Sequence, residues 1–242
     1  MGGYAGSGEF KKRISFFRIP IDVIFFMLVI IDFDGVLFDD ARFKKEWESL
    51  FRRAGISRGI YEKTYQESKR KGYYDARLHV KLAYGSEAKK SFSQKYFYDS
   101  VMRCAEQSFR FVYKDAKPFL KFLRTKRVKT VLLSTGDSHF QKRKIMQSGL
   151  ADFFTRVMII RDVSKLKKMH AITGKKRDRV IFIDDKKRVV EEIKKSLPQI
   201  YVVQMRRQRN QESAAHVDAR VRNFSEVKRL LLGGLKHDTM AG

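Results

Sequence analysis

The sequence predicts an α/β fold in which a parallel β-sheet lies between layers of helices, with an all-helical subdomain inserted after the first strand. Two observations support this prediction. Four short apolar runs and a weaker fifth recur along the chain, and amphipathic helical patterns separate most of them, as in βαβ units. Residues 41–112, in contrast, contain helical patterns and no clear strand.

The expected strands are rich in β-branched and aromatic residues and are apolar at consecutive positions. Such runs are typical of strands that are buried on both faces, as in a parallel sheet. Both faces of the sheet are therefore expected to be covered by helices. The runs span residues 28–31, 130–134, 180–184 and 200–205, and the weaker run spans residues 156–160.

Three amphipathic helical patterns belong to the same part of the chain as these strands. Asp115 is expected to cap the first pattern and Ser138 the second, because a short polar side chain before a helix accepts hydrogen bonds from unpaired N–H groups. Gly149 and Pro198 end the second and third patterns. The three patterns cover residues 115–127, 138–149 and 186–198.

The inserted segment has helical patterns at residues 41–55, 59–72 and 91–112. The first places several large apolar residues on one helical face, which predicts a packed subdomain core. Other aromatic residues of the segment are expected to fill that core rather than to line a substrate pocket or stack bases. The face consists of Phe43, Trp47, Leu50 and Phe51, and the other aromatic residues are Tyr73, Tyr74, Tyr84, Phe92, Tyr96, Phe97 and Tyr98.

These patterns predict the domain organisation. Residues 27–39 and 113–232 are expected to form the α/β core, residues 40–112 the helical subdomain, and residues 233–242 a C-terminal tail. Residues 1–26 are expected to be a leader outside the native fold.

Two features of the leader support this interpretation. Its "GSGEF" resembles a cloning scar or upstream reading-frame residues, and Met27 would serve as a start codon. The apolar residues 14–31 are not expected to span a membrane, because Arg18, Pro20 and Asp22 interrupt them.

The charge and cysteine content limit the classes of partner and compartment. The formal net charge is +26, from 53 Lys and Arg against 27 Asp and Glu, which favours anionic partners such as phosphorylated metabolites or nucleic acid. The charge is scattered, so surface solvation is the simpler interpretation. The lone Cys104 excludes an intrachain disulfide and argues against a zinc site, and we expect a cytoplasmic location.

Polar residues follow three of the expected strands at the point where each strand ends. Because the carboxyl ends of parallel strands meet at one edge of a sheet, these residues are expected to lie together. Several carboxylates in one place repel each other, and a Mg²⁺ ion offsets that cost. The residues are Asp32 and Asp34, Ser134 and Thr135, and Asp184 and Asp185.

An aspartate in such a place can attack a phosphoryl group, and a carboxyl group two residues later can protonate the leaving oxygen. The motifs resemble those of the haloacid dehalogenase (HAD) superfamily: "DFDGV", "VLLST" and "VIFIDD" match its first, second and fourth motifs. The resemblance covers roughly residues 27–205. It implies a Rossmann-like three-layer core, and the inserted helices resemble the family's C1-type cap.

The resemblance also implies roles for individual residues. Asp32 would be the nucleophile and a Mg²⁺ ligand, and Asp34 the general acid and base, with its backbone carbonyl on the metal. Ser134 would bind the phosphoryl group. Asp185 would be the main metal ligand of the fourth motif, assisted by Asp184. Further contacts to substrate are expected from Gly35, Thr135 and Gly136.

The third motif is a lysine upstream of the fourth. Lys165 lies 184 − 165 = 19 residues before Asp184, a spacing that fits the family, while Lys167 and Lys168 remain alternatives. Asp39, Asp40 and Asp137 are expected to be hinge or capping residues more than substrate contacts.

The resemblance implies a Mg²⁺-dependent phosphatase that acts on a small phosphorylated metabolite or nucleotide through an aspartyl-phosphate. Dehalogenation is disfavoured, because dehalogenases of this family lack the second acid that is Asp34 here. A nucleic-acid end phosphatase, a sugar phosphomutase and a non-catalytic basic binding module are the alternatives. The sequence does not indicate an oligomeric state.

Overall fold

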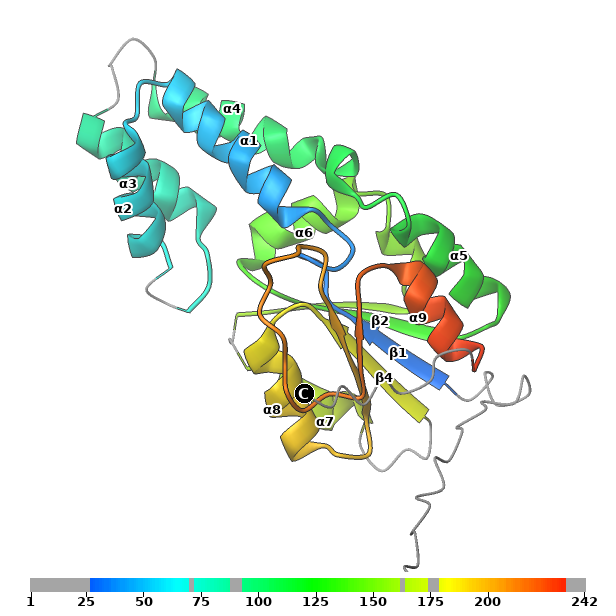
Figure 1. Cartoon of the computed structure of the whole chain (residues 1–242). Helices are drawn as coiled ribbons and strands as arrows, with labels where there is room; N and C mark the ends of the chain where they lie inside the picture. The colour runs from blue at the N-terminus through cyan, green and yellow to red at the C-terminus, as the bar shows by residue number, and fades with distance from the viewer. Residues whose placement is uncertain (1–26, 70–71, 88–92, 162–163, 174–178, 234–242) are drawn as a thin grey trace, which may run out of the picture.

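The chain folds into an α/β core with three layers and a group of helices at one end of the sheet (Figure 1). One six-stranded sheet has the order β3-β2-β1-β4-β5-β6, and all of its neighbouring strands are parallel. The predicted fold class is therefore confirmed. A computed structural model describes residues 27–69, 72–87, 93–161, 164–173 and 179–233.

Five of the strands agree with the predicted runs to within one residue at each end. The sixth was missed, because it has only three residues and its middle residue is an exposed arginine. The strands are β1 (Met27–Ile31), β2 (Lys129–Thr135), β3 (Arg156–Ile160), β4 (Arg179–Asp184), β5 (Tyr201–Met205) and β6 (Ala219–Val221).

The central strand β1 is buried along its whole length, and its alternate residues face opposite helical layers. Val29 and Ile31 pack in one cluster with α5, α6 and α9, while Leu28 and Ile30 pack in another with α7 and α8. Each such side chain contributes about 1.5–3 kcal/mol by its burial. These helices are α5 (Ala116–Thr125), α6 (Ser138–Gln147), α7 (Leu166–Thr173), α8 (Lys187–Ser196) and α9 (Phe224–Leu231).

Two predicted helix caps differ from the structure. Asp137, not Ser138, caps α6, since its Oδ1 accepts hydrogen bonds from the N–H groups of His139 and Phe140. Asp115 does precede α5, but its carboxylate caps nothing there. It accepts instead from Arg207 Nη1 and from the N–H of Phe224, each at 2.8 Å, and so joins α5 to α9.

The remaining helices form the group that Figure 1 shows beyond the end of the sheet. Its core includes Phe43, Trp47 and Phe51, at most 3% exposed, as the face of the first helix predicts. The third helix of the group was not predicted. The helices are α1 (Asp40–Arg53), α2 (Arg58–Glu67), α3 (Ala76–Glu87) and α4 (Gln94–Glu106); short 3₁₀ helices cover Ser108–Phe111 and Ala151–Phe153.

Two chain segments that lie side by side connect this group to the core. The N–H of Asp39 donates to Phe111 O at 2.7 Å, and the N–H of Tyr113 donates to Leu37 O at 3.0 Å. Both connections thus pass through one narrow paired segment, on which the helical group is mounted. We call this group, α1 to α4, the cap; the domain boundaries drawn from the sequence remain predictions.

Some sequence predictions lie outside the described residues. These are the leader at residues 1–26, the tail beyond residue 233, and the adjoining ends of the patterns 59–72 and 91–112. Within the described part of the chain, no helix combines the length and the apolar character needed to cross a bilayer.

A neutral histidine lies in the core of the cap. His79 is fully buried, its ring stacks on Phe51 at 4.4 Å, and its Nε2 lies 3.3 Å from Tyr61 O. Because a carbonyl can only accept, Nε2 carries the proton and Nδ1 accepts from the Tyr74 hydroxyl at 2.8 Å. Burial lowers the pKa of His79 to about 4, despite its hydrogen bond to the Tyr61 carbonyl.

We expect the stability of the chain to fall as the pH decreases from about 6.5 toward 4, in part because of His79. In this window the unfolded chain binds a proton at His79 that the folded chain does not bind, which costs ~3 kcal/mol at most. Denaturant titrations at pH 7 and pH 4.5 should show a smaller loss for His79→Gln than for the parent protein. The exposed His139→Gln variant is the control. Equal losses in all three proteins would contradict the assignment.

Candidate active site

The site lies where the strand order reverses. β1 has β2 on one side and β4 on the other, so the carboxyl ends of these three strands are neighbours. Ligand sites of open parallel sheets form at such switch points. Asp32 directly follows β1, Ser134 lies at the end of β2 and Asp184 ends β4. The structure thus brings together residues that are more than 100 positions apart in the chain.

The loop after β1 turns back tightly against the end of β4. The N–H of Asp32 donates to Ile183 O at 2.9 Å, and Phe33 O accepts from the N–H groups of the residues that follow. Gly35 has φ +78°, and a Cβ at this position would lie 2.5 Å from Asp185 Oδ2. Glycine is therefore required here for its conformation and for the close approach of the Asp185 carboxylate.

Lys165 connects the first and last acidic motifs. Its Nζ lies 2.6 Å from Asp32 Oδ1 and 2.7 Å from Asp184 Oδ2, and its side chain is 1% exposed. Burial opposes its charge, but the two carboxylates outweigh that effect and raise the pKa of Lys165. Lys167 and Lys168, the alternatives from the sequence, are exposed.

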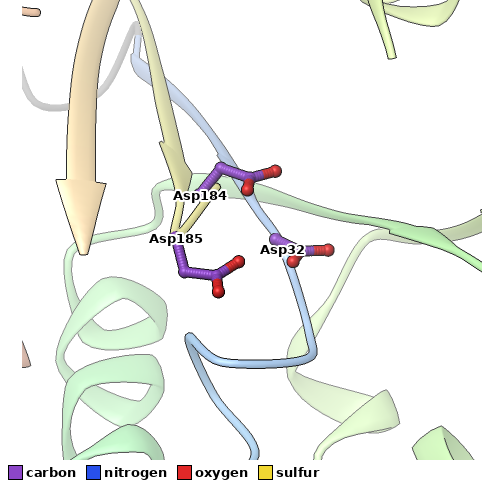
Figure 2. Close-up of side chains that lie close together, drawn as sticks. All are labelled: Asp32, Asp184 and Asp185. Atoms are coloured by element: carbon purple, nitrogen blue, oxygen red, sulfur yellow. The ribbon is translucent and has the colours of Figure 1, made fainter. Parts of the chain in front are cut away.

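Three carboxylates face a common space at this edge of the sheet. Figure 2 shows Asp184 and Asp185 at the end of β4 and Asp32 beside them, where the chain leaves the neighbouring strand β1. Each offers an oxygen within 4.8 Å of the others. Burial and the neighbouring carboxylates raise the pKa of Asp185 to about 8. Burial also raises the pKa of Asp32 to about 6, although Lys165 opposes this.

This cluster fits a divalent cation. Asp32 Oδ2 and Asp185 Oδ1 are buried and have no hydrogen-bond partner, and such orphaned acceptors are costly. Lys165 pairs with one oxygen of Asp32 and one oxygen of Asp184. Among the described residues, no cationic side chain lies at ion-pair distance from Asp185. A hard cation bound by the cluster would satisfy Asp185 Oδ1, and oxygen ligands of this kind are the ones that Mg²⁺ prefers.

Asp34 has a different environment from Asp32. Its Oδ1 lies 2.6 Å from Lys144 Nζ, and its Oδ2 accepts from Gln141 Nε2 at 2.6 Å. Gln141 Nε2 also donates to Ser134 Oγ at 2.8 Å, so one amide connects the hydroxyl to the carboxylate. Burial acts to raise the pKa of Asp34, but Lys144 and these hydrogen bonds lower it below its ordinary value.

Sequence reasoning missed both of these partners. Lys144 is 3% exposed and lies among aromatic rings, 4.7 Å from the centroid of Phe38 and 5.0 Å from that of Phe43. Gln141 and Lys144 are three residues apart on α6, so they lie on one face of that helix. The sequence feature that could have indicated them is their position on the helix that directly follows β2, because the buried face of that helix contacts the site.

A cleft of about 310 Å³ opens between this edge of the sheet and the cap, a size at the lower end for small-molecule sites. Thr135 and Gly136 line it, and Gly136 N donates to Ile160 O at 2.9 Å. Asp39 caps α1, as expected of a hinge residue. Asp40, in contrast, lines the cleft.

Comparison with known proteins gives the family. The sequence profile of the haloacid dehalogenase-like hydrolases matches residues 26–223. No curated protein sequence matches the chain. Among solved structures, a protein described as a haloacid dehalogenase-like hydrolase from Burkholderia xenovorans LB400 is similar with a TM-score of 0.68 and 21% identity, over 83% of this chain and 94% of that one.

Two further structures differ in the activity that their descriptions give. A protein described as a β-phosphoglucomutase from Thermotoga maritima has a TM-score of 0.62 and 15% identity, over 86% of this chain and 100% of that one. L-2-haloacid dehalogenase from Xanthobacter autotrophicus has a TM-score of 0.58 and 17% identity, over 88% and 99%. At these identities the likeness shows a shared fold and leaves the reaction open.

We expect Mg²⁺ to stabilise the purified protein against heat. An ion at 100 times its dissociation constant adds about 2.7 kcal/mol, which raises the Tm by about 5–10 °C. Asp185→Asn should lose this response and should not be less stable without metal, because it removes charge repulsion. The exposed Asp152→Asn is the matched control and should keep the response. A full Mg²⁺ response in Asp185→Asn would contradict the site.

Proposed function

This chain belongs to the haloacid dehalogenase-like hydrolases, and we propose that it hydrolyses small phosphomonoesters in a Mg²⁺-dependent reaction through a phosphorylated Asp32. The observation that carries the proposal is that two carboxylates on one turn have different lysine partners. Asp32 lies with Lys165 in the acidic cluster, and Asp34, two residues later, has its own cation in Lys144.

Asp32 is suited to be the nucleophile. Its Oδ1 is held by Lys165 at 2.6 Å, which leaves Oδ2 without a hydrogen-bond partner and available to attack phosphorus. Asp32, Asp184 and Asp185 would hold the Mg²⁺ ion, which would supply positive charge to offset that of the phosphoryl oxygens. Ser134, oriented by Gln141, would donate to a phosphoryl oxygen.

Asp34 is suited to proton transfer. Lys144 and Gln141 fix both of its oxygens, so its orientation toward the cleft is set before substrate binds. Its ionised state is the one that a base needs to activate water against the phosphorylated Asp32. In the first half of the reaction, the proton for the leaving oxygen would come from the pair that Asp34 and Lys144 form.

This arrangement favours an ester oxygen over a halide as the leaving group. A departing halide needs no proton, so a dehalogenase would have no use for a carboxylate with two dedicated partners at this position. The cleft between core and cap favours a small substrate over a nucleic-acid end, which remains an alternative together with phosphomutase activity.

We expect Asp32→Asn to lower phosphate release by about 1,000-fold or more while the fold is retained, because the amide is a far poorer nucleophile. The assay is phosphate release from sugar phosphates, nucleotides and 3′- or 5′-phosphorylated oligonucleotides, with Mg²⁺ and with EDTA. Circular dichroism confirms folding. Activity that persists in Asp32→Asn or in EDTA would refute the proposal, and isomerisation without phosphate release would indicate a mutase.

We expect Lys144→Met to lower kcat about 100-fold for alkyl phosphates and much less for an aryl phosphate such as p-nitrophenyl phosphate. Alkoxide leaving groups need the proton that the pair supplies, whereas p-nitrophenolate leaves without it. Lys142→Met, an exposed lysine on the same helix, is the control. Equal losses for both substrate types would show that Lys144 only supports the structure.

A further inference from the structure

The two walls of the cleft differ in how their charges are paired. On the core wall, Asp34 is bound by Lys144 and Gln141, and Asp137 accepts from the first N–H groups of α6. These carboxylates are already compensated. A cationic group on a substrate would therefore find little unpaired negative charge here beyond the proposed Mg²⁺ cluster.

The cap wall carries Lys44 of α1 and Lys69, which follows α2. Lys44 Nζ lies 2.5 Å from Asp40 Oδ2 and is half exposed. Lys69 lies over the ring of Tyr65, with its Nζ 4.9 Å from the centroid. Among the described residues, no carboxylate lies at ion-pair distance from Lys69, although it lines the cleft.

A third lysine approaches from the core. Lys186, which follows Asp185, lines the same cleft. Partial burial lowers the pKa of Lys69, and the charges of Lys44 and Lys186 lower it further. Lys44 is paired with Asp40, and Lys186 directly follows the acidic cluster in the chain. Lys69 is therefore the lysine of these three whose charge is least compensated by neighbouring carboxylates.

We propose that the cleft selects phosphomonoesters whose leaving group carries a second anionic group, which Lys69 and Lys44 of the cap bind. This rests on the proposed function, because it places the phosphoryl group at Asp32 on the core wall. The second group is a carboxylate or another phosphate, since both accept hydrogen bonds from ammonium groups. The Tyr65 ring beside Lys69 would contact the body of the leaving group.

A neutral leaving group fits this cleft poorly. It would displace water from the Lys69 ammonium group and offer no hydrogen-bond acceptor in its place, which is unfavourable. A site with an unpaired polar group therefore discriminates strongly against ligands that lack a group to pair with it. Selectivity would therefore reside in the cap, whereas the groups that act on phosphorus lie in the core.

Binding calorimetry with phosphonates, which cannot be hydrolysed, tests this without turnover. With Mg²⁺ present, 3-phosphonopropionate and propane-1,3-bisphosphonate should each bind the full chain about tenfold or more tighter than propylphosphonate. Phosphonoacetate and 4-phosphonobutyrate vary the spacing between the two anions. The carboxylate and bisphosphonate series show which kind of second group the cap prefers.

Lys69→Met should remove most of this preference, and Lys44→Met/Lys69→Met all of it, while the affinity for propylphosphonate falls much less than that for the doubly charged phosphonates. Lys45→Met, an exposed neighbour of Lys44 on α1, is the matched control and should keep the preference. Equal affinities for doubly and singly charged phosphonates, a preference that survives in the double variant, or no binding of any phosphonate would overturn the proposal. A hydrolase without this selectivity would still release phosphate from singly charged esters, so the two failures are distinct.

Discussion

The buried ion triad of Lys165 with Asp32 and Asp184 is the interaction on which the rest of the site depends. Parallel strands bring their carboxyl ends together, and here two neighbouring strands end in acidic residues. Without Lys165, the carboxylates of Asp32 and Asp184 would be buried next to each other without a cation. Removal of one partner of a buried ion pair costs about 3–5 kcal/mol. The single positive charge of Lys165 does not balance the three carboxylates of the cluster. The remaining negative charge favours binding of a cation.

The same argument explains why two carboxylates on one tight turn can have different chemistry. Asp32 shares its lysine with Asp184 and lies beside Asp185, and its pKa is raised. Asp34 has Lys144 close at hand and an amide on its other oxygen, and its pKa is lowered. The difference arises from α6 and from the segment before α7, which supply the two lysines. Neighbours that are distant in the sequence thus separate the roles of the two residues.

The sequence allowed prediction of those features that depend on local pattern. The apolar runs predicted five strands, and the acidic or hydroxyl residues at the ends of three of them predicted the edge of the sheet at which the site lies. Lys144 and Gln141 could not be found in this way, because their partner Asp34 is 110 and 107 positions away. Lys165 could not be separated from Lys167 and Lys168 by spacing, whereas burial separates them at once. The predicted Ser138 cap was wrong because α6 begins at Ser138 itself, so the capping position falls on Asp137 one residue earlier.

The excess of lysine and arginine therefore says less about function than the position of a few of them. A net charge of +26 is compatible with any anionic partner. Lys165 and Lys144 are buried and paired with carboxylates, so their charges mainly stabilise the site. Lys69 lines the cleft with an aromatic ring as its neighbour, and its charge is available to a ligand. Since Lys69 belongs to the cap, the subdomain that encloses the substrate would also bind its second anionic group.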